Sequence, residues 1–182
     1  MNGTLYIIIP AYNEEANILN VINQWYPVIK AHSAHGTSRL VIIDDGSKDS
    51  TYHIMLEASK TRPLLLPITK ENSGHGGTVL YGYKYALDNG ADYVFQTDSD
   101  GQTLPSDFEK FWWQRDNYDM VIGWRKGRQD GSAGRVCAGR HPGRNSGGRS
   151  ADDGAGKTDR PPALLGALGA SFERNCTQGC ET

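Results

Sequence analysis

Five short apolar runs alternate with helical patterns up to residue 123, and this alternation limits the folds that the chain can adopt. The runs cover residues 5–9, 40–43, 64–68, 93–97 and 120–123. Between them, apolar residues recur every three or four positions, as on the buried face of a helix. Strands that alternate with helices predict an α/β fold: a Rossmann-like, mostly parallel sheet with right-handed crossovers and helices on both faces.

Smaller features indicate where these elements begin, end and bury their side chains. Asn13 is of a type that caps a helix, and Pro27 should kink or end the first helix near its last turn. Pro63 and Pro67 predict that the third strand lies near an edge of the sheet. The helix after that strand should bury a face made of Val79, Leu80, Tyr83, Ala86 and Leu87.

The composition changes abruptly near Gly131. All nine Tyr and all four Trp precede residue 125, whereas all three Cys follow residue 131. Residues 132–182 carry few large apolar side chains, so they cannot bury enough surface to offset the entropy of ordering. We therefore predict a domain at residues 1–131 and a low-complexity, disordered tail at 132–182. A shifted reading frame or an engineered scar after about Gly131 would also produce this break.

Charge and cysteine spacing exclude several classes of protein. The net charge of -2 and the pI near 6.2 give no reason to expect nucleic acid as a partner. No apolar run is long enough for a signal peptide or a membrane span, which favours a soluble, cytoplasmic protein. Cys176 and Cys180 lack the second pair of Cys or His that a zinc site requires.

A pair of carboxylates follows the fourth apolar run. Asp98 and Asp100 lie beside Gln102 on a turn at Gly101. Adjacent acids repel each other, and hard oxygen ligands in an open set suit Mg²⁺ or Mn²⁺ that carries the phosphates of a substrate. A solvated Asp/Gly turn is the alternative. A calcium-binding EF-hand loop does not fit, because its required Gly and Glu positions are not filled.

Other polar groups also follow the predicted strands. Asp44 and Asp45 come directly after the second run, where an acid can accept a ribose hydroxyl or a base N–H, although a capped turn has the same pattern. A glycine loop, 72–77, opens the third helix but lacks the third Gly of the dinucleotide fingerprint. Its His75 is more typical of a turn than of a catalytic base.

Arg125 belongs to a cationic group after the fifth run and could clamp a diphosphate, with a solvated charge run as the alternative. In a parallel sheet all these groups should gather at one rim.

Taken together, these motifs resemble the family 2 glycosyltransferases of the GT-A fold, close to the polyprenol-phosphate (dolichol-phosphate) mannosyltransferase group. The motifs that carry the resemblance are, in chain order, Pro10-Ala-Tyr12-Asn13-Glu14-Glu15, Asp44-Asp45-Gly46-Ser47-Lys48-Asp49, Asn72-Ser-Gly74-His-Gly76-Gly77, Asp98-Ser-Asp100-Gly-Gln102 and Gly123-Trp-Arg125. The resemblance covers about residues 3–131. Nothing after Ser132 resembles the family's acceptor-binding segment or its membrane helices.

The resemblance implies particular roles for these residues. A nucleoside-diphosphate sugar, with UDP or GDP as its nucleotide, would be bound by Pro10, Tyr12, Glu14, Asp44, Asp45, Gly74 and Gly76. The metal bridging the diphosphate would be held by Asp98, Asp100 and Gln102. Asp98, Asp100 and Arg125 would be the catalytic residues, with Arg125 facing the phosphates or the acceptor.

The family inverts the anomeric centre by direct displacement, which normally requires a base, and the part of the chain before residue 132 offers no strong candidate. An anionic lipid phosphate needs no base, so a polyprenyl-phosphate acceptor at the inner face of a membrane is favoured over a glycan hydroxyl. The chain could instead be an inactive fragment that binds nucleotide sugars without the acceptor half. A nicotinamide-dependent oxidoreductase is supported only by the α/β pattern and the glycine loop.

Overall fold

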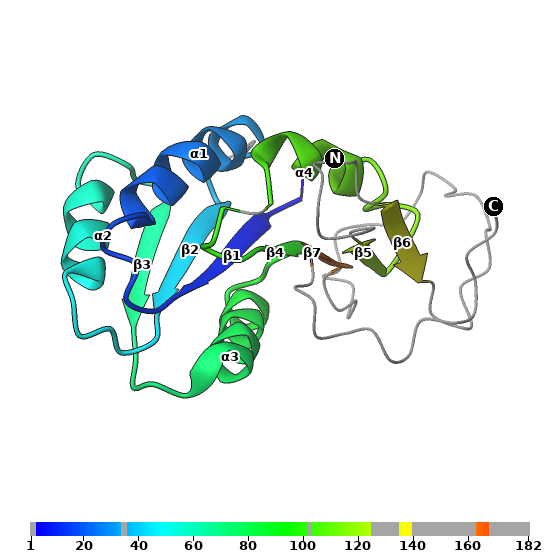
Figure 1. Cartoon of the computed structure of the whole chain (residues 1–182). Coiled ribbons are helices and arrows are strands. Elements are labelled where there is room, and N and C mark those ends of the chain that lie inside the picture. Colours follow the sequence, from blue (N-terminus) through cyan, green and yellow to red (C-terminus); the bar gives the residue numbers. More distant parts are fainter. Residues whose placement is uncertain (1–2, 34–35, 102, 125–134, 140–162, 168–182) are drawn as a thin grey trace.

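A computed structural model describes residues 3–33, 36–101, 103–124, 135–139 and 163–167 of the chain. Four helices and seven strands lie within these residues (Figure 1). In chain order they are β1 (Leu5–Ala11), α1 (Ile18–Ala31), β2 (Arg39–Asp44), α2 (Thr51–Ser59), β3 (Leu65–Thr69), α3 (Gly74–Asp88), β4 (Tyr93–Gln96), α4 (Pro105–Trp112), β5 (Met120–Trp124), β6 (Arg135–Gly139) and β7 (Ala163–Ala167).

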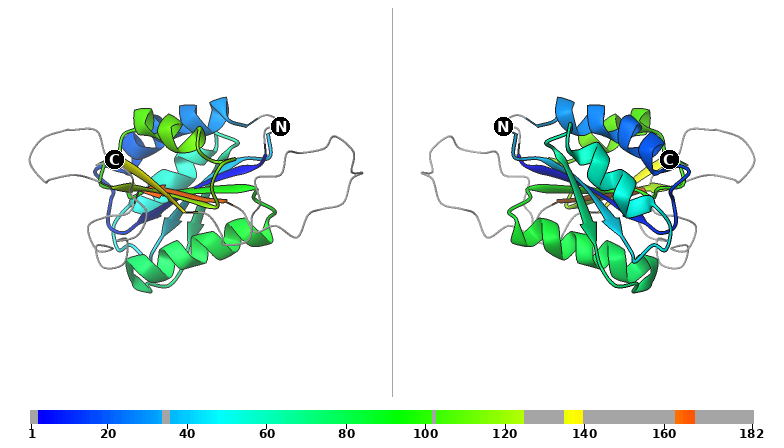
Figure 2. Two further views of the ribbon diagram at one scale, coloured as in Figure 1. Left: turned by 90° about the vertical axis from the view of Figure 1, so that its right-hand side faces the viewer. Right: turned by 90° about the vertical axis from the view of Figure 1, so that its left-hand side faces the viewer.

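The strands form one sheet in the order β3-β2-β1-β4-β7-β5-β6. Every pair in this sheet is parallel except β5 with β6. Helices α1, α2 and α4 cover one face, and α3 covers the other (Figure 2). This arrangement confirms the predicted α/β fold with a mostly parallel sheet, and β3 lies at an edge as its two prolines predicted.

Alternation along β1 divides its side chains between two cores. Ile7 and Ile9 belong to the core beneath α1, α2 and α4, where the rings of Trp25 and Phe95 lie 5.4 Å apart. Ile8 belongs to the second core, beneath α3. Each fully buried side chain of this size stabilises the fold by about 1.5–3 kcal/mol, so the two cores together hold the sheet between its helices.

The carboxyl ends of β1, β2 and β4 meet at one rim of the sheet. The Asp45 amide donates to the Ala11 carbonyl at 2.9 Å, and the Thr97 amide donates to the Ile8 carbonyl at 3.2 Å. The Lys70 amide donates to the Asp44 carbonyl at 3.1 Å. The motifs that follow the first four strands therefore gather at the same rim, as the sequence predicted.

One expectation about the first helix is wrong. Asn13 has a φ of +53° and lies in the loop before α1, which begins at Ile18 after Asn17. Pro27 lies inside α1, which ends one turn later at Ala31. Pro27 faces solvent on α1, while Trp25 and Ile29 on either side of it are buried in the core and hold both halves of the helix.

The predicted buried face of the third helix is also partly wrong. Leu80 and Leu87 are 54% and 49% exposed, whereas the buried residues of α3 are Thr78, Gly82 and Ala86. A Cβ at Gly82 would lie 2.9 Å from Ile43 Cδ1, so α3 approaches the sheet through its smallest residues. Close packing of small residues turns the larger apolar side chains outward.

Two strands lie within residues 132–182, which the composition predicts to be disordered. β6 pairs with β5, and β7 pairs between β4 and β5. For these two segments the structure departs from the prediction, because a strand that inserts into an existing sheet needs few apolar side chains of its own. The rest of the predicted tail lies outside the described residues. No helix in the described part of the chain is both long and apolar enough to cross a bilayer.

Candidate functional site

Two loops at the rim, one after β1 and one after β2, are joined by reciprocal hydrogen bonds. The Asn13 amide donates to Ser47 Oγ at 2.8 Å, and the Lys48 amide donates to Asn13 Oδ1 at 2.9 Å. The Glu15 amide donates to Asp49 Oδ2 at 3.1 Å. These bonds satisfy loop backbone groups that would otherwise need water, and they fix the two loops relative to each other.

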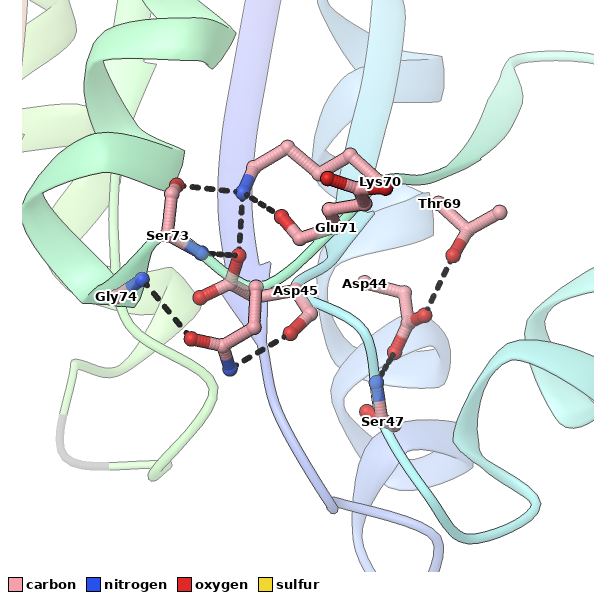
Figure 3. Close-up of polar contacts among 9 residues, drawn as sticks. Asp44, Asp45, Ser47, Thr69, Lys70, Glu71, Ser73 and Gly74 are labelled. Carbon is pink, nitrogen blue, oxygen red and sulfur yellow. Dashed lines mark hydrogen bonds and ion pairs between the residues drawn. The ribbon is translucent and has the colours of Figure 1, made fainter.

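The two adjacent acids after β2 point in different directions (Figure 3). Asp44 is buried and accepts hydrogen bonds from Thr69 Oγ1 at 2.7 Å and from the Ser47 amide at 3.2 Å. Both of its oxygens are therefore used to join β2, β3 and the following turn. Asp44 thus connects β2, β3 and the following turn, and its neighbour Asp45 turns toward the glycine loop.

Asp45 is held by the chain that leads into α3. Lys70 Nζ donates to Asp45 Oδ1, and it also donates to the Glu71 carbonyl at 2.9 Å and to Ser73 Oγ at 2.7 Å (Figure 3). The Ser73 amide donates to the same Asp45 oxygen at 2.9 Å. Burial by itself would raise the pKa of Asp45, but these hydrogen bonds outweigh it and lower the pKa. Asp45 is therefore an anion at neutral pH.

The acidic turn after β4 contacts the glycine loop. Asp98 Oδ1 lies 2.9 Å from His75 Nε2 and accepts a hydrogen bond from Gln96 Nε2 at 2.9 Å. Asp100 is exposed in the following turn, and Gly101 has a φ of +72°, which a glycine adopts without strain. The tight turn predicted at Gly101 is thus confirmed, and His75 joins the glycine loop to it.

The first loop also anchors this acidic turn. Asn17 Nδ2 donates to the Ser99 carbonyl at 2.7 Å, and Ser99 Oγ donates to Glu14 Oε1 at 3.2 Å. The sequence analysis missed Asn17 and Ser99, because their contact joins positions far apart in the chain. Their position next to predicted site residues was the only signal available.

A cavity of about 430 Å³ opens between these loops. Five of the seven residues predicted to bind the nucleotide line it, whereas Asp44 and Gly76 do not. Its lining consists of Pro10, Ala11, Tyr12, Glu14, Asp45, Asn72, Gly74, His75, Thr78 and Ser99. The structure therefore brings together the β1, β2, β3 and β4 motifs, and Asp45 rather than Asp44 is among the lining residues.

A second and larger hollow, of about 580 Å³, lies along the outer side of α3. Leu80, Tyr81 and Lys84 line it together with residues of the loop before α3. It holds none of the predicted site residues. The smaller cavity is the candidate site because the converging polar groups, rather than volume, distinguish a binding site from a surface groove.

The donor set of the acidic turn fits a hard divalent cation. Asp98 and Asp100 supply carboxylate oxygens, and Mg²⁺ or Mn²⁺ commonly takes one or two carboxylates together with substrate phosphates. Within the described residues, no group of three or more His, Cys, Asp or Glu side chains is arranged to hold a metal ion. The predicted ligand Gln102 and the predicted catalytic Arg125 lie outside the described residues.

Two curated proteins are similar in sequence. One is the UDP-N-acetylglucosamine–dolichyl-phosphate N-acetylglucosaminyltransferase of Methanococcus voltae, 38% identical over 119 residues, which cover 58% of this chain and 45% of the relative. Another is a dolichyl-phosphate beta-glucosyltransferase of Trichomonas vaginalis, 30% identical over 131 residues, which cover 66% and 40%. The matched part of the chain spans less than half the length of either relative.

A solved structure is similar in fold. The mannosyltransferase PcManGT from Pyrobaculum calidifontis, in complex with GDP-Man and Mn²⁺, has a TM-score of 0.53 and 19% identity, and the match covers 70% of this chain and 36% of that one. At this level of identity the likeness supports the fold alone.

The family model for glycosyl transferase family 2 matches residues 6–161 of the chain. The match begins within β1, includes the described elements from α1 to β6 and extends past residue 131, where we predicted the domain to end. It agrees with the motif order that suggested the resemblance, and the chain belongs to glycosyl transferase family 2.

Proposed function

We propose that this chain binds a nucleoside-diphosphate sugar, with UDP or GDP as its nucleotide, and transfers the sugar to an acceptor. The observation that carries the proposal is the cavity of about 430 Å³, in which the ionised Asp45 and the loop residues around the acidic turn converge. The family and the two dolichyl-phosphate transferase relatives support a lipid phosphate as the acceptor. A glycan hydroxyl remains the second candidate acceptor.

The nucleoside end of the donor belongs beside Asp45. An anionic carboxylate accepts N–H and O–H groups, which the base and the ribose provide, and it repels phosphates. Pro10 and Tyr12 supply apolar and aromatic surface in the same cavity, where Tyr12 is 45% exposed and available for contact. The diphosphate would then extend toward His75 and the acidic turn.

Asp98 and Asp100, with Gln102 from outside the described residues, would hold Mg²⁺ or Mn²⁺. When bound, such an ion offsets the negative charge that develops on the departing diphosphate. Asn17 and Ser99 hold the turn that carries the two carboxylates. Arg125, also outside the described residues, is proposed to face the phosphates or the acceptor.

Transfer to a lipid phosphate needs no general base. An oxygen of the acceptor phosphate, anionic at neutral pH, would attack the anomeric carbon from the side opposite the diphosphate. The carbon–oxygen bond to the diphosphate breaks, and the nucleoside diphosphate leaves with the electron pair, so the anomeric configuration inverts. This acceptor would place the protein on the cytoplasmic surface of a membrane.

The alternative is a fragment that binds the donor but transfers nothing. The matched part of the chain spans less than half the length of the two relatives. Donor binding without hydrolysis or transfer to any lipid phosphate would favour this alternative. Formation of a glycosyl phospholipid would exclude it.

Calorimetric titration of UDP, GDP and their sugars, with manganese or with a chelator, tests the proposal. We expect manganese to tighten binding and Asp100→Ala to abolish the increase. Asp88→Ala is the matched control, because Asp88 is an exposed acid at the end of α3, away from the rim. Equal binding in manganese and chelator would refute metal dependence, and no binding of either nucleotide would refute the proposed function.

A further inference from the structure

A buried hydroxyl in the cavity wall has no hydrogen-bond partner. Four buried side-chain polar atoms lack one among the described residues, namely those of Ser33, Thr78, Thr97 and Arg115. Of these four residues, Thr78 alone lines the candidate cavity. A buried polar atom without a partner is unusual in a native protein and needs a physical explanation.

The position of Thr78 suggests what that explanation is. Thr78 lies near the start of α3 and is fully buried, on the side of the helix that faces the sheet. Its hydroxyl is near enough to Asp45 to help lower the pKa of that carboxyl, although it does not meet the geometry of a hydrogen bond. Thr78 and Asp45 therefore form one polar patch in the wall of the cavity.

We propose that Thr78 binds the nucleoside of the donor, accepting a hydrogen bond from an N–H of the base or an O–H of the ribose beside Asp45. The inference rests on the proposed function and names a residue that contributes to binding the donor. In the absence of ligand the hydroxyl has no partner among the described residues. The bound nucleoside supplies one.

The charge of Asp45 selects the part of the donor that fits here. A hydroxyl beside an anion turns its hydrogen toward the anion, which leaves its lone pairs for a ligand donor. Phosphates carry no such donor and are repelled by the carboxylate. Lys70 offers a phosphate no free N–H group, because its ammonium group already donates to Asp45, Glu71 and Ser73. The patch therefore suits the donor groups of a nucleoside.

Three substitutions test the proposal. Thr78→Val removes the hydroxyl but keeps the shape of the side chain, and Thr78→Ser keeps the hydroxyl. Thr97→Val is the matched control, because Thr97 is also fully buried and unpartnered but does not line the cavity. The measurements are the dissociation constants of UDP and GDP in manganese and the melting temperature of each free protein.

We expect Thr78→Val to weaken binding of the preferred nucleotide roughly threefold to tenfold, the effect of one hydrogen bond. Thr78→Ser and Thr97→Val should bind as the wild type does. The melting temperature of free Thr78→Val should stay close to that of the wild type, because the lost contact with Asp45 offsets the removal of a buried hydroxyl without a hydrogen-bond partner. A matched titration with the 2′-deoxy nucleotide identifies the contact. If Thr78→Val binds the 2′-deoxy nucleotide as tightly as the wild type does, the contact is to the ribose. If Thr78→Val still binds it more weakly, the contact is to another group of the nucleoside.

Two results would overturn this inference alone. One is wild-type affinity in Thr78→Val, and the other is an equal loss in Thr97→Val, which would indicate a general effect on packing. In either case the wild-type protein would still bind the nucleotide, and the proposed function would stand. Failure of the wild-type protein to bind UDP or GDP would overturn both.

Discussion

Replacement of Lys70 by methionine removes the cation that pairs with Asp45 but keeps a side chain of similar length. Both partners are enclosed, since the side chain of Lys70 is 14% exposed and that of Asp45 is 5% exposed. The variant leaves a buried carboxylate whose remaining described hydrogen bond comes from the Ser73 amide. Removal of one partner from a buried ion pair costs about 3–5 kcal/mol. We expect the free energy of unfolding to fall by about 3 kcal/mol at pH 8. This value is at the lower end of that range, because Lys70 keeps some contact with solvent.

The loss should depend on pH. In the wild type the pKa of Asp45 is lowered, so this carboxyl stabilises the fold above its unfolded pKa, and the stabilisation is lost only as the pH falls through the folded pKa. In Lys70→Met the burial of Asp45 is no longer opposed by the ammonium group, so we expect its pKa to rise above the unfolded value. The carboxyl then destabilises the fold at high pH, and protonation relieves this as the pH falls.

Urea unfolding at pH 8 and pH 5, followed by tryptophan fluorescence, measures both effects. The deficit of Lys70→Met should be smaller at pH 5, and the double variant Lys70→Met/Asp45→Asn should be more stable at pH 8 than Lys70→Met alone. Lys60→Met is the control, because Lys60 pairs with Glu57 on an exposed helix surface and its loss should change little. A deficit under about 1 kcal/mol at pH 8, the range of an exposed pair, or the same deficit at both pH values, would refute the reasoning.

Two further substitutions test the fold and the site. Gly82→Ala places a methyl group against Ile8 and Ile43, so we expect it to lower the free energy of unfolding by about 1–3 kcal/mol, measured with urea. A variant as stable as the wild type would contradict the close approach of α3. Asn17→Ala removes the hydrogen bond to the Ser99 carbonyl and should weaken manganese-dependent nucleotide binding about tenfold in calorimetry, because the acidic turn loses its support. If Asn17→Ala binds the nucleotide as tightly as the wild type does, both in manganese and in chelator, the turn needs no such anchor.

Much of the fold could be predicted because its signals are local. Each of the five predicted apolar runs forms a strand. The apolar residues at helical spacing after the first run are buried in α1, namely Ile18, Val21, Ile22, Trp25 and Ile29. The convergence at one rim followed from the parallel order of the strands. The errors occurred where tertiary packing overrides a local preference. The helix α3, for example, packs against the sheet through Gly82 rather than through its leucines.

The contacts of the site were harder to predict because they join residues far apart in the sequence. Lys70 reaches Asp45 across 25 positions, and Asn17 reaches Ser99 across 82. Neither residue belongs to a motif whose spacing signals such a contact. The strand β7 was missed for a related reason. Ala163–Ala167 has only two large apolar residues and becomes a strand through its pairing with β4 and β5.

The different directions of Asp44 and Asp45 follow from their positions at the end of β2. Successive side chains of a strand alternate between the faces of the sheet. Ile42 lies in the core beneath α1, α2 and α4, so Asp44 continues that side, whereas Ile43 lies in the core beneath α3, so Asp45 turns toward α3.

The same alternation applies to the neighbouring strands. On β1, Ile8 lies beneath α3 and is followed two positions later by Pro10, which lines the cavity. On β4, Val94 lies beneath α3, and alternation leads through Gln96 to Asp98, which contacts His75 of α3. Alternation thus assigns the candidate site to the face that α3 covers, and a nucleoside beside Asp45 would lie against the start of that helix, where Thr78 is buried.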